Sequence, residues 1–135
     1  YTIKGYDKAP SAVSKAKDNI RNANLEDYVT IAEDNFFDTE KQSQGKLHMV
    51  FNPPYDERLD IHMEEFYKNI GDTLKKGYPG TNAWFITANL EALKFVGLKP
   101  SRKIKLFNAS LEARLVKYEM YEGSKRTKFQ VAEKE

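Results

Sequence analysis

The stretch LHMVFNPPY, residues 47–55, joins a short apolar run to an asparagine, two consecutive prolines and a tyrosine. The run LHMVF is compact and apolar, which is typical of a strand buried in a sheet. Proline has no N–H to donate to a strand ladder, so Pro53 and Pro54 end the strand at Asn52. The stretch therefore predicts a buried strand followed by a stiff loop, and that loop is either a simple turn or a binding site.

Alternating strands and helices surround this stretch. Short runs rich in β-branched and aromatic residues predict strands, and apolar residues at helical spacing predict helices. In chain order the predicted elements are a strand at 1–6, a helix from Pro10 to about Ala23, strands at 28–32 and 47–51, a helix from Ile61 to about Gly77, a strand at 82–87 and a short helix at 91–96. Residues 103–121 alternate apolar and polar positions, which predicts two further strands in an antiparallel hairpin. This order predicts an α/β domain around a mostly parallel sheet.

Composition and charge narrow the class of protein. The chain has 135 residues, 40% of them hydrophobic and 31% charged, which fits one soluble, globular domain. It has no cysteine and only two, isolated, histidines, so neither a disulfide nor a metal site is expected. With no membrane-length apolar run and no signal peptide, the expected location is intracellular, in the cytoplasm. Residues 99–135 carry ten Lys and Arg against five Asp and Glu, which could favour a polyanion or simply form a solvated basic face.

Asp7, Asp34 and Asn52 each stand just beyond the carboxyl end of a predicted strand. In open α/β sheets ligands bind beyond that end of the strands, so the three residues are expected to line one edge. A carboxylate placed like Asp7 can accept hydrogen bonds from both hydroxyls of a ribose. From position alone, the alternative that Asp7 caps the following helix is at least as well supported.

Asp34 lies in the segment AEDNFFD, residues 32–38, where a carboxylate precedes two aromatic residues. It could accept a hydrogen bond from an adenine amino group while Phe36 or Phe37 packs against the ring. A loop acid followed by two core phenylalanines is the simpler interpretation, and it would be preferred if this segment stood alone.

The loop that begins at Asn52 has a more specific interpretation. Pro53 and Pro54 are expected to point their carbonyl oxygens out of the loop, and the Asn52 side chain adds another acceptor. Two rigid acceptors suit an exocyclic amine, because hydrogen bonds to both protons aim the nitrogen lone pair at an electrophile. Tyr55 offers a face on which a flat base can stack, a contact worth roughly 1–3 kcal/mol. With a strand before it and a helix after it, the loop is interpreted as a binding site.

The motif Asn52-Pro53-Pro54-Tyr55 resembles that of Rossmann-like, S-adenosylmethionine-dependent methyltransferases that methylate amines. More narrowly, NPPYDERL resembles the NPPYGERL of bacterial ribosomal RNA methyltransferases that modify guanine N2 in large-subunit RNA. The segment KLFNASLEARLVKYEMY, residues 105–121, resembles the final hairpin of the same family. The resemblance covers essentially the whole chain, and it implies a class I methyltransferase sheet that is mostly parallel with an antiparallel C-terminal hairpin.

This resemblance implies roles for the positions that would hold the cofactor, S-adenosylmethionine. Asp7 would hold the ribose hydroxyls. Asp34 would take the adenine amino group, with the Asn35 backbone and Phe36 beside the ring.

The same resemblance implies roles for the motif. Asn52 and the Pro53 carbonyl would grip the target amine, Pro54 would keep the loop stiff, and Tyr55 would stack on the base. A base inside a paired stem would have to flip out to reach such a pocket.

Several positions depart from the family pattern or are open to two interpretations. Asp56 stands where the family usually has glycine, and Ala9 stands where a second acid is common. Glu57 and Arg58 follow the motif and could shape the pocket or form an ion pair that anchors the loop.

The family's first strand and glycine-rich loop would precede Tyr1, as would the RNA-binding domain that commonly accompanies the catalytic domain. Residues 1–135 are therefore expected to be a partial catalytic domain, from the second strand to the carboxyl end. Because the first strand is central in that fold, its loss should expose the edges of neighbouring strands and leave the chain alone catalytically incomplete.

The first expectation is thus an RNA guanine-N2 methyltransferase. Methylation of adenine N6 or of a glutamine amide remains open within the same chemistry. A non-catalytic module that binds RNA or a partner protein is the alternative from another class. In either class the basic residues of the last third would contact phosphates: Lys99, Arg102, Lys103, Lys105, Lys125, Arg126 and Lys128.

Overall fold

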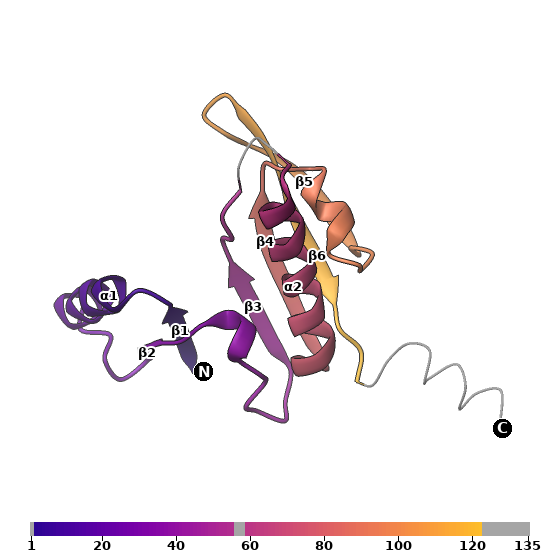
Figure 1. The fold of residues 1–135 in the computed structure, drawn as a ribbon. Coiled ribbons are helices and arrows are strands. Elements are labelled where there is room, and N and C mark those ends of the chain that lie inside the picture. The colour runs from indigo at the N-terminus through magenta and orange to yellow at the C-terminus, as the bar shows by residue number, and fades with distance from the viewer. Residues whose placement is uncertain (1, 56–58, 123–135) are drawn as a thin grey trace, which may run out of the picture. The chain divides into compact units, whose positions relative to one another are not determined.

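The computed structural model describes residues 2–55 and 59–122 (Figure 1). The chain divides into two compact units, Tyr1–Thr39 and Glu40–Glu135, and each is described by itself.

The first unit is a small βαβ arrangement. Strand β1 (Ile3–Asp7) pairs in parallel with β2 (Val29–Glu33), and helix α1 (Pro10–Asn22) contacts both strands. Pro10 starts α1, where its missing N–H removes no helical hydrogen bond. Among the described residues of this unit, Val13 is the only buried apolar side chain. A two-stranded sheet with so little buried surface has little stability of its own.

The second unit is a four-stranded sheet with a helix on one face. Its elements are β3 (Leu47–Phe51), α2 (Ile61–Gly77), β4 (Thr81–Thr87), the 3₁₀ helix η2 (Ala92–Phe95), β5 (Arg102–Asn108) and β6 (Leu111–Glu119). The spatial order is β3-β4-β6-β5, with β3 parallel to β4 and the other two pairs antiparallel. Asp60 caps α2, because its Oδ1 accepts a hydrogen bond of 2.9 Å from the Met63 N–H.

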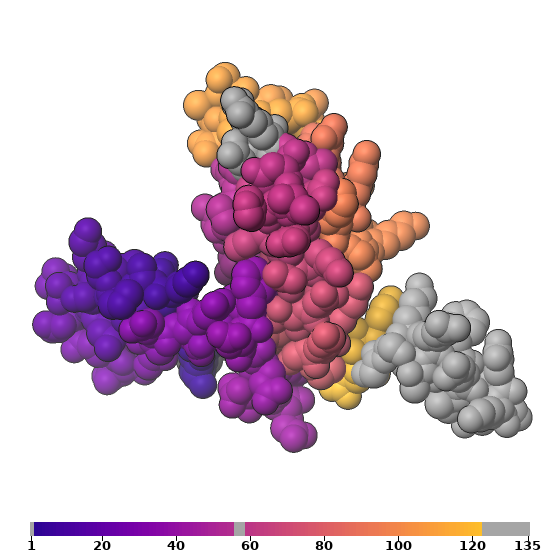
Figure 2. All heavy atoms as spheres, in the orientation of Figure 1, coloured from indigo at the N-terminus to yellow at the C-terminus, as the bar shows by residue number. Residues whose placement is uncertain are grey.

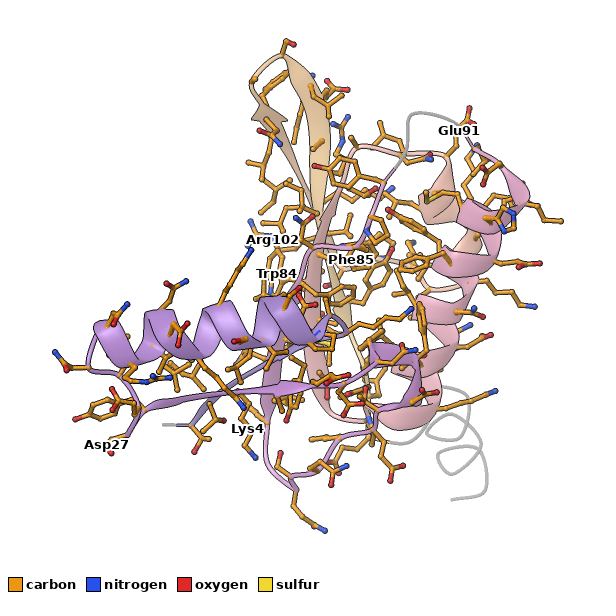
Figure 3. All side chains as sticks on the ribbon, turned by 60° about the vertical axis from the view of Figure 1, so that its left-hand side comes forward. Lys4, Asp27, Trp84, Phe85, Glu91 and Arg102 are labelled. Atoms are coloured by element: carbon orange, nitrogen blue, oxygen red, sulfur yellow. The ribbon has the colours of Figure 1, made fainter. Side chains whose placement is uncertain are left out.

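The core of this unit lies between α2 and the sheet. Alternate residues of β4 are buried, so Phe85 points toward α2 while Trp84 points to the opposite side (Figure 3). The Phe85 ring stacks on Phe51 and Tyr118, with centroids 5.0 and 5.5 Å away, and meets Tyr67 edge-on at 6.2 Å. This aromatic cluster fixes the carboxyl ends of β3 and β4 relative to the first half of α2.

Close packing of α2 on the η2 segment depends on a glycine. A Cβ added at Gly71 would lie 1.7 Å from the carbonyl oxygen of Val96, so only glycine fits there. The β5–β6 hairpin extends past the rest of this unit, as the space-filling view shows in orange and yellow (Figure 2).

The sequence predicted these elements closely, including the α/β class and the antiparallel hairpin. It missed the 3₁₀ helix η1 (Phe36–Asp38), and it placed the end of the first helix at Ala23, which is the C-cap of α1. As predicted, parallel pairing joins β1 to β2 and β3 to β4, and antiparallel pairing among the described residues is confined to the pairs formed by the C-terminal hairpin, whose strand β6 inserts between β4 and β5. Within the described chain, β1 pairs only with β2 and β3 only with β4, so each has an open edge.

Candidate functional site

The first group of candidate residues lies at the carboxyl ends of β1 and β2. The Asp34 N–H donates to the Asp7 carbonyl at 3.0 Å, so the two strand ends stay joined beyond the last ladder pair. The Asp7 side chain accepts from the Ala9 N–H at 2.8 Å, and the Asp34 side chain accepts from the Asn35 N–H at 2.9 Å. Both carboxylates are exposed, and one oxygen of each is held by the local backbone. The other oxygen of each has no hydrogen-bond partner among the described residues.

The alternative role of Asp7 as a helix cap is met only in part. The N-cap of α1 is Ala9, whose side chain offers no acceptor, and Asp7 bonds the N–H of Ala9 itself. Asp7 therefore shapes the turn into the helix, but it satisfies none of the free N–H groups inside the first turn of α1.

Asn35 and Phe36 form the next part of this loop. The Asn35 side chain caps η1 by accepting from the Phe37 N–H at 3.1 Å, and the Asn35 carbonyl accepts from the Asp38 N–H at 2.9 Å. Because the Asn35 N–H is also bonded to Asp34, both backbone groups of Asn35 are engaged within the loop. The rings of Phe36 and Phe37 are half-buried, with centroids 5.7 Å apart. Contact of a ligand with the Asn35 N–H would require the bond to Asp34 to open.

The second group of candidate residues follows β3 in the other unit. Asn52 is exposed, Pro53 is buried, Pro54 is exposed and Tyr55 is half-buried. The burial of Pro53 anchors the loop and leaves the Asn52 side chain facing solvent. The structure thus brings together Asn52, Pro53, Pro54 and Tyr55 at the end of β3, and Asp7, Asp34, Asn35 and Phe36 at the end of β1 and β2. That Asp7, Asp34 and Asn52 line one edge stays a prediction.

The Pro54 carbonyl, which the sequence predicted to point out of the loop, is bonded to another part of this unit. It accepts a hydrogen bond of 3.3 Å from the hydroxyl of Tyr67, which is fully buried on α2. The Tyr67 hydroxyl is also 2.6 Å from Thr87 Oγ1, at the end of β4, and Thr87 in turn accepts from the Asn89 N–H at 3.1 Å. Burial raises the pKa of Tyr67; the hydrogen bond with Thr87 lowers that pKa, and the charge of Tyr55 raises it further.

Sequence reasoning missed Tyr67 and Thr87. Tyr67 stands next to Phe66 on the apolar side of a predicted helix, and Thr87 closes a predicted strand, so each looked like an ordinary framework residue. A buried hydroxyl needs a partner, and that requirement was the available signal that Tyr67 bonds something nearby.

The basic residues are only partly described. Lys99, Arg102, Lys103 and Lys105 are exposed, and Lys105 lies 2.8 Å from Glu112, whose pKa it lowers by a hydrogen bond. Three more predicted phosphate contacts lie outside the described residues: Lys125, Arg126 and Lys128. The three positions after the motif also lie outside them: Asp56, Glu57 and Arg58.

Neither a metal-binding group nor a membrane-spanning helix is found in the part of the chain that the structure describes. It has no group of three or more His, Cys, Asp or Glu that could hold a metal ion. None of its helices has the length and apolar character needed to cross a membrane.

Comparison with known proteins identifies the family. The model of the family described as "UPF0020: RMKL-like, methyltransferase domain" matches residues 1–117. The chain belongs to this family. This match confirms the family resemblance found in the sequence, at the level of an RMKL-like methyltransferase domain.

Curated relatives of this chain are named as ribosomal RNA methyltransferases. A ribosomal RNA large subunit methyltransferase K/L from Syntrophotalea carbinolica is 31% identical over 125 residues, covering 87% of this chain and 17% of the relative. The chain spans about a sixth of the length of the curated relatives it matches.

Solved structures share the fold. SMU.472, described as a candidate methyltransferase complexed with SAH, has a TM-score of 0.77 and 28% identity over 91% of this chain and 32% of that chain. A predicted N6-adenine-specific DNA methylase from Listeria monocytogenes has a TM-score of 0.71 and 26% identity over 87% of this chain and 30% of that chain. The predicted fold class, an α/β Rossmann-like methyltransferase sheet, is confirmed.

Proposed function

We propose that this chain is part of the catalytic domain of an enzyme that methylates the exocyclic amine of a base in RNA. Guanine N2 of large-subunit ribosomal RNA is the target we favour, and such a reaction would take place in the cytoplasm. Support comes from the family, from relatives named as ribosomal RNA methyltransferases, and from the Asn52 loop. The observation that carries the proposal is the exposed Asn52 side chain, set on a buried proline at the carboxyl end of a parallel strand.

The proposed cofactor is S-adenosylmethionine, which supplies an electrophilic methyl group when bound. The residues present fit its nucleoside part, because Asp7 and Asp34 each have a carboxylate oxygen that no described residue occupies. Asp7 would accept from the ribose hydroxyls and Asp34 from the adenine amino group, with Phe36 beside the ring. Contact from the Asn35 backbone is the weaker part of the fit, since its N–H is already bonded.

Asn52 and Pro53 would hold the target amine. The side-chain oxygen of Asn52 and the carbonyl of Pro53 would accept its two protons, so that its lone pair is aimed away from the ring plane. Tyr55, half-buried beside them, would stack on a base flipped out of its stem. No proton acceptor of high basicity is required for this step, because the amine loses its proton only after its nitrogen has become positively charged.

We also propose that residues preceding Tyr1 in a longer protein supply a central strand and a glycine-rich loop, together with an RNA-binding domain. The open edges of β1 and β3 support this, as does the small share of each relative that the chain spans. Among the described residues of the first unit only one apolar side chain is buried, which further supports added contacts from such residues.

The test uses the enzyme extended upstream and a large-subunit RNA transcript. Asn52→Ala should lower methyl transfer by about 100-fold or more, because an acceptor for the amine is lost, while calorimetric affinity for S-adenosylhomocysteine stays the same. Asn69→Ala, which removes an exposed asparagine from α2, serves as the matched control. Unchanged turnover in Asn52→Ala would exclude this role for the loop.

One alternative has an observation in its favour. The similar structure described as an N6-adenine-specific DNA methylase suggests adenine as the target. Mass spectrometry of nucleosides from the methylated RNA separates the two, since N2-methylguanosine and N6-methyladenosine differ in mass. Failure of the extended, folded enzyme to bind S-adenosylhomocysteine would favour a non-catalytic module instead.

A further inference from the structure

We propose that Tyr67 is a positioning residue that holds the Asn52–Tyr55 loop in its working conformation through a directed chain of hydrogen bonds. The chain runs from the Asn89 N–H through the hydroxyls of Thr87 and Tyr67 to the Pro54 carbonyl. This inference rests on the proposed function and assigns a role to a residue that would not touch the substrate.

The direction of the chain follows from its two ends. The Asn89 N–H can only donate, and the Pro54 carbonyl can only accept. Tyr67 has a single hydroxyl proton, so if it donates to Pro54 at 3.3 Å it must accept from Thr87 at 2.6 Å. Thr87 then donates once and accepts once from Asn89 at 3.1 Å. In the reverse direction, Pro54 would lose its donor and the Thr87 proton would need an acceptor that the described residues do not supply.

The loop depends on this bond because prolines limit its other options. Pro53 and Pro54 have no N–H, so these two residues can be tied to the fold only through their carbonyls or by side-chain packing. Among the described residues, the Tyr67–Pro54 bond is the only hydrogen bond from residues 52–55 to another part of the chain. It is therefore the directional contact that sets how the loop is turned.

Burial makes this contact effective. Tyr67 and Thr87 are fully buried, so water does not compete for their hydroxyls. The Tyr67 hydroxyl is protonated at neutral pH and can donate, and burial raises its pKa further above neutrality. Tyr67 lies on α2 and Thr87 ends β4, so the loop that follows β3 is held by two other elements of the second unit.

The hydrogen bond from Tyr67 gives the two proline carbonyls different roles. Because Tyr67 already bonds the Pro54 carbonyl, we assign the target amine to the Asn52 side chain and the Pro53 carbonyl. If the Pro54 bond is lost, the loop can rotate, and a misplacement of about 1 Å at the amine can cost about 100-fold in rate.

The test compares two buried tyrosines of the same core in the enzyme extended upstream. Tyr67→Phe removes the hydroxyl but keeps the ring that packs against Phe85. Tyr118→Phe makes the same chemical change at a buried hydroxyl that has no hydrogen-bond partner among the described residues. We expect kcat to fall by about 10- to 100-fold in Tyr67→Phe with KM and cofactor affinity nearly unchanged, and no change of kcat in Tyr118→Phe.

A second pair of variants guards against a simple folding defect. Thr87→Val keeps the shape of the side chain but breaks the chain one step earlier, whereas Thr87→Ser keeps the hydroxyl. Valine should reduce kcat in the same direction as Tyr67→Phe, and serine should restore it. Equal kcat in Tyr67→Phe and Tyr118→Phe, or in Thr87→Val and Thr87→Ser, would overturn the proposal.

A readout that needs no turnover separates this inference from the proposed function. The ¹³C chemical shift of the Pro54 carbonyl reports a hydrogen bond to that oxygen, so it should change in Tyr67→Phe and stay the same in Tyr118→Phe, whether or not the protein methylates RNA. An inactive wild type with this pattern of shifts would defeat the proposed function and keep the anchor. An active wild type without this pattern would defeat the anchor alone.

Discussion

Gly71 lies against the backbone of Val96, so replacing it with alanine tests the packing of α2 on the η2 segment. A Cβ at Gly71 would be 1.7 Å from the Val96 carbonyl oxygen and 2.7 Å from its carbonyl carbon. Real Cβ atoms essentially never come closer than 3.0 Å to another heavy atom. The helix and the segment at Val96 would therefore have to separate by more than 1 Å, and a backbone cannot rotate aside as a side chain can.

Two effects of opposite sign decide the expected change in the free energy of unfolding. Glycine is worse than alanine inside a helix by about 1 kcal/mol, so helix propensity alone predicts that Gly71→Ala is stabilising. Overpacking a core costs about 1–3 kcal/mol, and a clash between two backbones belongs at the upper end of that range or above it. We therefore expect a net loss of about 2 kcal/mol or more.

Urea denaturation followed by the fluorescence of Trp84, the one tryptophan of the chain, reports on this unit directly. Asn69→Ala, at an exposed position two residues earlier on α2, is the control and should stabilise by a few tenths of a kcal/mol. If Gly71→Ala is as stable as the wild type or more stable, the close approach of α2 to Val96 is wrong.

Two further predictions concern the same unit. Burial raises the pKa of Tyr118 to about 12 from 10.0, so its stabilising contribution is complete below pH 10 and is lost as the pH rises through about 12. Between pH 9 and pH 12, the free energy of unfolding should fall by about 2 kcal/mol more in the wild type than in Tyr118→Phe. Equal losses would show that Tyr118 is not buried. Asp60→Ala removes the cap of α2 and should cost about 1 kcal/mol by urea denaturation, whereas Asp60→Asn, which keeps an acceptor, should cost much less.

Much of the fold could be predicted from the sequence because its boundaries are marked by residues with strong local preferences. Pro10 starts a helix, the paired prolines stop β3 after Phe51, and Pro79-Gly80 separates α2 from β4. Local preference also placed Asn52 correctly beyond a strand end. Such signals act over a few residues, so they give the elements and their order along the chain.

The order of strands in the sheet and the contacts of the loop depend on residues far apart in the sequence. The insertion of β6 between β4 and β5 cannot be read from a hairpin pattern, which predicts only that β5 and β6 pair. Likewise, the bond from Tyr67 to Pro54 spans 13 residues and that to Thr87 spans 20. A helical pattern says that Tyr67 is on the buried side, but it does not say which strand end its hydroxyl reaches.

The paired prolines explain why such a distant donor is needed. A loop that must present acceptors to an amine benefits from having few N–H groups of its own, since those would compete for the same oxygens. The same shortage prevents the loop from fixing itself by backbone hydrogen bonds. Its orientation must then come from a donor elsewhere in the fold. The hydroxyl of Tyr67 on α2 is such a donor, and because it is buried, water does not compete for it. On this reasoning Tyr67 and the two prolines act together to orient the loop. A substitution that restores an N–H to the loop, such as Pro54→Ala, should therefore make the orientation of the loop less dependent on Tyr67.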